Sequence, residues 1–340
     1  MQQDWSDFLK EQGAAIEQGA VAHFGAPQEE LHTARDGLVV ADLSYYGLIA
    51  FSGEEAQGFL HSQVTNDLRT LAPETALFAG HCTAKGRLLA NFLVFKRDAD
   101  ILLMLPEAVR ESAQKRLAMF ILRAKVKARD AGPEWVRLGL NGIGARETLV
   151  NAIGAAPDGM MAVIHTDSAF AVQLGDNRFD LFVQPAHARV VWQALVTEAR
   201  PVGAAVWDWL MVRAGVPSIL PATQDQFVPQ MANMDVLHGV SFQKGCYPGQ
   251  EIVARTQYLG KVKRRAYLAH VEAEAKAGAE LYSPDLAGQS CGMVANAAPA
   301  PGGGSELLAV ILVASFEAGE VRLKGLDGPR LTFEPLPYGL

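Results

Sequence analysis

The chain has 340 residues, a formal net charge of −7 and 49% hydrophobic residues. This length predicts two or three domains, and the composition supports packed cores and excludes a disordered chain. The negative charge argues against binding nucleic acid or an anionic membrane through bulk charge, and no apolar run approaches the roughly 18 residues of a membrane span. The N-terminus shows no signal or transit pattern, so we expect a cytoplasmic bacterial protein with reduced cysteines.

The first half of the chain predicts an amphipathic helix followed by an α+β unit. The helix is expected over residues 1–26, with Trp5, Phe8 and Val21 facing the first domain. The unit over residues 27–130 then predicts strands at 37–43 and 46–51, a helix through Phe59 and Leu60, strands and turns over 76–105 with a hairpin turn at 84–87, and a helix over 107–122.

Residues 131–260 repeat this order of elements. The pattern predicts a strand at 135–140, a glycine turn, a helix at 145–153, three strands and a helix at 186–198, then an apolar helix at 204–212. The turn contains Gly142 and Gly144, but Glu147 stands where a dinucleotide loop needs its third glycine, so we interpret it as a plain turn. Two such rounds predict duplicated α+β halves within residues 1–260.

The rest of the chain divides at about Gly260. Residues 217–239 are long, irregular and polar, which is typical of a functional loop because they lead directly into a cysteine-bearing turn. Beyond residue 260, short strand-like runs separated by glycine-rich turns predict an antiparallel β-barrel or sandwich over 261–340.

The cysteine-bearing turn is the run Lys244-Gly245-Cys246-Tyr247-Pro248-Gly249-Gln250-Glu251. Glycine and proline predict a tight turn, and Pro248 suits the first turn of a helix carrying Gln250 and Glu251. Cys246 is then expected next to Lys244 and just before a helix N-terminus, and both neighbours favour a thiolate. The alternative is a buried structural cysteine, the commoner fate of a free thiol.

Other candidate sites are weaker. No pair of histidines has metal-ligand spacing, so a preformed zinc site is not expected, although one thiolate can share a metal with another protein. Cys82 and Cys291 suit strand cores. His238 lies upstream of Cys246 as in a Cys/His hydrolase, but nothing in the sequence pairs them. The basic runs at 123–129 and 261–265 fit solvated faces better than RNA contacts, because no aromatic residues interleave them.

The run K-G-C-Y-P-G-Q-E-x-x-A-R resembles the signature of the YgfZ-type folate-binding proteins. These are relatives of the glycine-cleavage T protein, an aminomethyltransferase, and of mitochondrial proteins that help to mature iron–sulfur enzymes. The similarity extends over nearly the whole chain and includes residues 62–67, 81–87, 214–217, 227–233 and 334–338.

The resemblance implies an α+β fold of two pseudo-repeated halves plus the C-terminal barrel, as a three-domain ring around a channel that binds tetrahydrofolate. It implies that the aromatic rings at Tyr46 and Trp207 lie against the folate. Arg213 stands where the family has a glutamate, which favours a contact with the glutamyl tail of folate.

The resemblance also bears on catalysis. The aminomethyltransferase branch carries an acidic residue in a G-G-x-x-D-D run, and the corresponding run here ends in Ala90-Asn91. A methyl group and an amide supply neither negative charge nor a general base, so transferase activity is not expected.

These observations lead to one hypothesis and two rivals. The hypothesis is a tetrahydrofolate-binding accessory protein for iron–sulfur cluster assembly or repair that supports enzymes such as those that thiolate tRNA. Cys246 is its functional thiol, acting in transient cluster ligation, in thiol exchange or in scavenging of a folate adduct. Lys244 favours the thiolate, Gly245 and Gly249 shape the turn, and Gln250 and Glu251 complete it. Its partners are folate and iron–sulfur assembly or client proteins, without a membrane or direct nucleic-acid contact. The rivals are a folate-dependent one-carbon transferase or demethylase and a tRNA-binding module.

Overall fold

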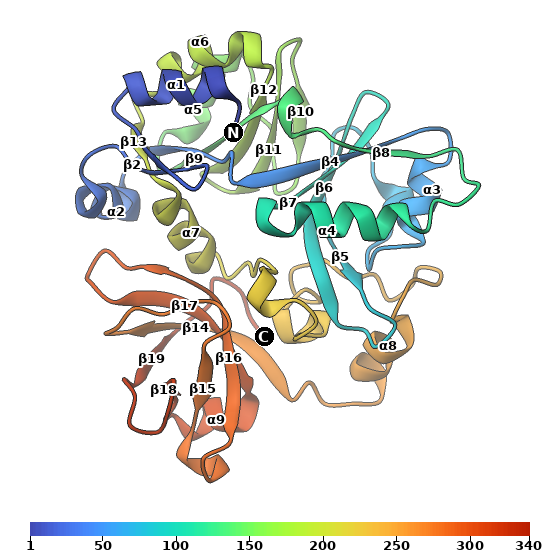
Figure 1. Ribbon diagram of the computed structural model, residues 1–340, viewed down its shortest axis with the longest axis vertical. Coiled ribbons are helices and arrows are strands. Elements are labelled where there is room, and N and C mark those ends of the chain that lie inside the picture. Colours follow the sequence, from blue (N-terminus) through green and yellow to red (C-terminus); the bar gives the residue numbers. More distant parts are fainter.

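A computed structural model describes residues 1–340 as a mixed α/β protein with three large sheets (Figure 1). Two of the sheets lie side by side in the upper half of the view, and the third forms the lower part. Helix α7 (Ala204–Arg213) and the chain that follows it run between them. None of the helices combines the length and apolar character needed to span a bilayer.

The first sheet contains a strand, β4, that is buried on both faces. Its strands, in hydrogen-bonding order, are β5 (Leu77–Cys82), β6 (Leu88–Arg97), β7 (Asp100–Pro106), β4 (Tyr46–Ser52) and β8 (Lys127–Asp130). Along β4, Leu48 and Ala50 face one core while Ile49 and Phe51 face another, which explains why this strand reads as a continuous apolar run. Helices α3 (Ala56–His61) and α4 (Glu107–Ala118) cover the outer face.

The second sheet takes one strand, β3, from residues 27–130. Its order is β10 (Val163–His165), β11 (Ala169–Gly175), β12 (Arg178–Val183), β9 (Val136–Asn141), β3 (Val39–Asp42) and β13 (Arg200–Val202). Its outer face carries α1 (Gln3–Glu11), α5 (Ala145–Ile153) and α6 (Pro185–Leu195). Its inner face packs on the first sheet, where Phe170 stacks on Phe182 at 4.5 Å and Phe95 tilts against Phe182 at 4.9 Å between ring centroids. Because β3 lies in this sheet, the two sheets do not divide at residue 130.

The third sheet is the antiparallel C-terminal one expected from the sequence. Its order is β18 (Arg322–Leu323), β15 (Glu280–Tyr282), β16 (Ser290–Pro299), β17 (Ser305–Leu312), β14 (Arg264–Val271) and β19 (Leu331–Glu334), with α9 (Val313–Ala318) beside it. A bridge between Arg322 and Arg330, and a bond from the Leu331 N–H to the Val321 carbonyl at 2.8 Å, join the two edges. The sheet therefore curls until its edges meet, which removes exposed edge strands.

The prediction of one helix over residues 1–26 is wrong. Helix α1 ends at Glu11, and Gly13 follows with a positive φ of 91°. A hairpin of β1 (Ala15–Glu17) and β2 (Ala20–His23) comes next, turning at Gln18 and Gly19, both with positive φ. Glycines at positive φ stop the helix and set a two-residue turn, and these signals outweigh the apolar spacing. Helix α2 (Pro27–Asp36), absent from the prediction, follows.

Two further predicted helices have different bounds from those expected. Helix α4 ends at Ala118 rather than at 122, and the next residues form an exposed turn in which Leu122 has a positive φ. Helix α8 (Gln250–Tyr258) begins after Gly249, whose φ is 82°, so Pro248 precedes the helix instead of lying in its first turn. The thiol turn is accordingly separated from α8 by a left-handed glycine.

The segment 217–239 is ordered by buried polar side chains. It contains the short 3-10 helices η3 (Pro221–Thr223) and η4 (Pro229–Ala232). The Gln230 side-chain amide donates to the Val253 carbonyl at 2.8 Å, and that of Asn233 donates to the Ala266 carbonyl at 2.8 Å. Both side chains are fully buried. The segment therefore ties α8 to the C-terminal sheet.

Candidate functional site

Three adjoining cavities lie where the sheets and α7 meet. The innermost, about 40 Å³, is lined by residues that include Tyr46, Phe78, Asn91, Asp180, Trp207 and Met211. It shares Phe78, Leu174 and Val216 with a cavity of about 700 Å³ on one side. It shares Tyr46, Met211 and Ser218 with a cavity of about 260 Å³ on the other. The larger volume lies in the range of small-molecule sites, and the central constriction is mainly apolar.

The structure brings Tyr46 and Trp207 together at this constriction. Tyr46 opens β4 and Trp207 lies in α7, and both are almost completely buried. The Trp207 ring lies on the α-carbon of Gly139, where an added Cβ would come within 2.5 Å of it. Gly139 thus gives the indole ring its place against the second sheet.

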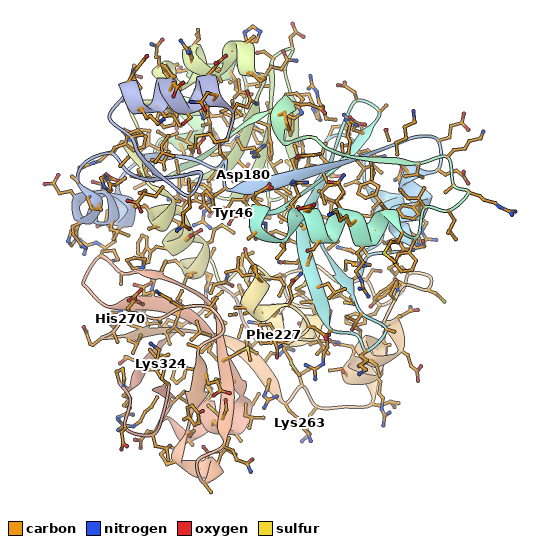
Figure 2. The ribbon with its side chains drawn as sticks, in the orientation of Figure 1. Tyr46, Asp180, Phe227, Lys263, His270 and Lys324 are labelled. Carbon is orange, nitrogen blue, oxygen red and sulfur yellow. The ribbon has the colours of Figure 1, made fainter.

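Asp180 is the main site residue that the sequence analysis missed. It lies on β12 opposite Gly139, and one of its carboxyl oxygens, Oδ1, is buried without a hydrogen-bond partner. Burial raises its pKa to about 7, opposed by the charge of Arg178. Figure 2 labels Asp180 close to Tyr46 between the two upper sheets. The available signal was a lone carboxylate in an apolar strand, on the same face as the buried Phe182.

Asp208 is a second carboxylate beside the cavities. It lines the cavity of about 260 Å³ and accepts a hydrogen bond from the Tyr45 hydroxyl at 3.0 Å. Burial raises its pKa to about 6. Two carboxylates thus flank the constriction with pKa values displaced toward neutrality, which is typical of functional cavities.

Asn91 lines the inner cavity, while Ala90 points into the opposite core. The Asn91 amide donates to the Pro217 carbonyl at 2.7 Å, and its oxygen accepts from the Ile219 N–H at 2.8 Å. Asn296 makes the same pair of contacts with the backbone of Ser218, at 2.9 and 3.0 Å. The position that carries an acid in the transferase pattern is therefore occupied by a side chain committed to holding residues 217–219.

Arg213 lines the largest cavity, but two carboxylates neutralise its charge. Its guanidinium forms ion pairs with Glu306, at 3.3 Å, and with Glu334. Arg178 lines the same cavity and bonds only the Asn141 side chain, at 3.1 Å. Burial lowers its pKa, opposed by the charge of Asp180. Arg178 is therefore the less neutralised cation in this cavity.

The thiol of Cys246 is exposed, and the side chain of Lys244 is not. The Lys244 ammonium donates to the backbone carbonyls of His61, of Val64 at 2.6 Å and of Asn66 at 3.0 Å. Burial lowers the Lys244 pKa to about 8. These carbonyls lie at and beyond the C-terminus of α3, where a cation is favoured. Lys244 thus anchors the turn to the 62–67 segment.

Gly249 fits the same turn against the β5–β6 hairpin. A Cβ on Gly249 would lie 2.4 Å from the Thr83 carbonyl oxygen and 2.6 Å from the Gly86 α-carbon. A Cβ on Gly245 would meet nothing within 4 Å. Gln250 donates to the Lys244 carbonyl at 3.4 Å, and the Glu251 side chain is exposed. The contact at Gly249 brings together two segments that the sequence analysis singled out separately.

Cys246 lines none of the three adjoining cavities, whereas His238 lines the largest. The β5–β6 hairpin connects the two regions: Phe78 and Asn91 line the inner cavity, and the turn at Gly86 touches the thiol turn. Figure 1 shows this hairpin descending to α8. The predicted site residues thus form two separate groups, an aromatic cavity and an exposed thiol.

The side chains that commonly bind metals are not grouped in this structure. No group of three or more His, Cys, Asp or Glu side chains is arranged to hold a metal ion. Cys82 and Cys291 are buried, as predicted, and burial raises their thiol pKa to about 12 and about 11. Cys246 is the one exposed thiol of the chain.

Comparisons with known proteins place this architecture in a family. The family model described as the GCVT N-terminal domain matches residues 8–241. The fold is similar to that of the glycine cleavage system aminomethyltransferase T from Bartonella henselae. The two structures superpose with a TM-score of 0.81 and share 18% sequence identity, and the superposition covers 98% of this chain and 96% of that chain.

Similar proteins of known name identify the family more closely. The chain is 32% identical to the tRNA-modifying protein YgfZ of Klebsiella pneumoniae over 320 residues, which cover 92% of this chain and 97% of the relative. It is 34% identical to the protein of that name from Colwellia psychrerythraea over 239 residues, 68% of this chain and 72% of the relative. The chain therefore belongs to the YgfZ family of proteins built on the GCVT N-terminal domain.

Proposed function

We propose that this chain is a tetrahydrofolate-binding accessory protein for the assembly or repair of iron–sulfur clusters, with Cys246 as its functional thiol. It supports iron–sulfur enzymes, including those that thiolate tRNA. The observation that carries the proposal is the pairing of an aromatic cavity containing an unpartnered buried carboxylate with one exposed thiol outside that cavity.

The cavity residues fit a pterin. A pterin presents ring N–H and amino donors on one edge, which suit the unpartnered oxygen of Asp180. Tyr46 and Trp207 both offer aromatic surface to the constriction. Because the inner cavity holds only about 40 Å³, a pterin requires the side chains that line it to move apart. The aminobenzoyl-glutamate portion has room in the cavity of about 700 Å³, where Arg178 offers charge less neutralised than that of Arg213.

Cys246 suits a cluster held jointly with another protein. Iron in such clusters is bound by thiolates, and this chain can contribute one of them, because it has one exposed cysteine. A cluster in transit would be the cargo of the protein. In this proposal Lys244 and Gly249 fix the turn that presents the thiol, while Gly245 leaves it open to approach.

One observation favours a second candidate, a folate-dependent one-carbon transferase. Asp180 has a pKa near 7 in the inner cavity and is thus poised to exchange a proton near neutral pH. Release of formaldehyde, or consumption of methylene-tetrahydrofolate, that depends on Asp180 would establish this activity. If neither the parent protein nor the Asp180→Asn variant releases formaldehyde or consumes methylene-tetrahydrofolate, the result favours the accessory role.

Tryptophan fluorescence tests the folate site. Tetrahydrofolate should quench the tryptophan fluorescence of the parent protein and of its Trp192→Phe variant. Trp192 belongs to α6 and is buried in the core between that helix, α1 and the second sheet, and it lines none of the three cavities. The Trp207→Phe variant should lose most of the response. If tetrahydrofolate leaves the fluorescence of the parent protein unchanged, the proposal that this chain binds tetrahydrofolate is wrong.

Complementation tests the thiol. Cys246→Ser should fail to restore the activity of iron–sulfur enzymes in a strain lacking the gene. Cys291→Ser is the matched control, since that thiol is buried in the C-terminal sheet. Full rescue by Cys246→Ser would remove the thiol from the proposal while leaving the folate site intact.

A further inference from the structure

Helix α8 presents an exposed apolar face next to the thiol. Its inward residue, Val253, is fully buried, whereas Ile252, Arg255 and Leu259 follow one another at helical spacing on the outside. Leu259 is 84% exposed and its neighbour Tyr258 67% exposed. Large apolar side chains gathered on one exposed helix face are typical of interaction sites. Figure 1 shows α8 at the edge of the molecule, beyond the tip of the β5–β6 hairpin.

This face is positively charged although the chain carries a net charge of −7. Lys85 lies at the hairpin tip beside Gly86, where a Cβ would meet Ile252 at 3.0 Å. Arg255, Lys261 and Lys263 complete the set, and Figure 2 labels Lys263 at the lower right of the view, on the chain leaving α8. None of these four cations has an ion pair or a side-chain hydrogen bond within the protein. Glu251 is the one acidic residue of α8.

We propose that this surface docks a second protein whose matching face is acidic around an apolar centre and presents a sulfur to Cys246. The surface, called here the α8 face, comprises Lys85, Ile252, Arg255, Tyr258, Leu259 and Lys261. It lies beside the thiol because Cys246 is three residues before Gly249, which precedes the helix. This inference rests on the proposed role of Cys246 and adds the chemistry of the partner.

A protein fits the α8 face better than RNA does. Ile252 and Leu259 are aliphatic and offer no flat ring on which a base can stack. The one aromatic ring, that of Tyr258, already packs edge-on against Phe242 at 6.0 Å and 73°. Unpaired cations around exposed aliphatic groups match the polar rim and apolar centre of protein interfaces.

Disulfide exchange with synthetic peptides tests the inference. Each peptide carries a central cysteine as a mixed disulfide with thionitrobenzoate, flanked by two leucines and then by four glutamates or four lysines. The Cys246 thiolate attacks the peptide sulfur, a protein–peptide disulfide forms, and coloured thionitrobenzoate leaves with the electron pair. The acidic peptide should react at least tenfold faster than the basic one at low salt, and the ratio should fall as salt rises.

Matched variants separate charge from apolar contact. The triple variant Lys85→Glu, Arg255→Glu, Lys261→Glu should invert the ratio of the two rates. Leu259→Ser should slow the acidic peptide several-fold, but should not slow a version whose leucines are replaced by serine. Cys246→Ser must abolish the reaction of every peptide. Equal rates for both charges, or a ratio that survives charge reversal, would overturn the proposal.

The same variants distinguish failure of this inference from failure of the proposed function. The triple variant should bind tetrahydrofolate like the parent and fail to support iron–sulfur enzymes. If it supports them fully while Cys246→Ser does not, the thiol role stands and the docking surface is wrong. If transfer RNA binds with a steep salt dependence and shields Cys246 from the peptides, the α8 face binds nucleic acid instead.

Discussion

Gly249 and Gly86 meet backbone to backbone, so that a Cβ on Gly249 would lie 2.6 Å from the Gly86 α-carbon. Gly249 also has a φ of 82°, a conformation that L side chains rarely adopt. This contact joins the exposed thiol turn to a hairpin whose other end lines the aromatic cavity. The arrangement of the two candidate sites therefore depends on two residues without side chains.

Gly249→Ala is expected to loosen the thiol turn. The added methyl group meets backbone atoms, so the turn must move away from the hairpin, at a cost of about 1–3 kcal/mol. Urea unfolding should show this loss, and amide hydrogen exchange over residues 244–250 should become faster. Gly245→Ala is the control, because its methyl group meets nothing within 4 Å. Equal stability of the two variants would contradict the role given to the Gly86–Gly249 contact.

Lys244→Met is expected to destabilise the protein by about 2–3 kcal/mol, because three carbonyl groups, of which that of Val64 is buried, lose a charged donor. The thiol turn should also exchange its amide hydrogens faster. Lys10→Met serves as the control, since that side chain is about half exposed and pairs only with Asp7. Unfolding curves that coincide for Lys244→Met and the parent would show that the ammonium is not an anchor.

Asn91→Asp is expected to lower stability without creating a transferase. The carboxylate can still accept from the Ile219 N–H, but it cannot donate to the Pro217 carbonyl and places a negative charge beside it. We expect a loss of about 1–3 kcal/mol in thermal or urea unfolding. Asn177→Asp, at an exposed position without a side-chain bond, should change stability little. A gain of aminomethyltransferase activity in Asn91→Asp would overturn the structural interpretation of this residue.

Asp180→Asn is expected to change the pH dependence of stability. Burial raises the Asp180 pKa from 3.8 to about 7, so the folded state holds this proton more tightly than the unfolded state. The stability contributed by the protonated carboxyl is complete below about pH 4 and is lost as the pH rises to about 7. Relative to the parent, Asp180→Asn should therefore become more stable by on the order of a few kcal/mol between pH 4 and pH 8.

Urea unfolding at several pH values measures this difference. Asp327→Asn is the control, because that aspartate is exposed and makes no side-chain bond. A constant difference in unfolding free energy between Asp180→Asn and the parent across this range would show that Asp180 has an ordinary pKa. The same variant should bind tetrahydrofolate at least tenfold more weakly if the carboxylate receives the pterin.

Local patterns in the sequence were sufficient for much of the fold. The continuous apolar run Tyr46–Phe51 is a strand because both of its faces are buried, and helices α5 and α7 have nearly the predicted bounds. The K-G-C-Y-P-G-Q-E run and its companions identified the family, because such segments keep their residues together in the chain. The same local reasoning failed over residues 1–26, where glycines at 13 and 19 interrupt the apolar spacing.

Only the tertiary structure decided the site. Asp180, Tyr46 and Trp207 come from three elements far apart in the sequence, and their meeting depends on how the two sheets and α7 pack. Arg213 is expected from the sequence to contact the glutamyl tail of folate, but Glu306 and Glu334 of the C-terminal sheet neutralise its charge. Lys244 adjoins Cys246 in sequence, yet its ammonium binds carbonyls more than 170 residues earlier. Charge and burial are set by such long-range contacts, so a sequence determines which groups are present and the packing determines which remain free to act.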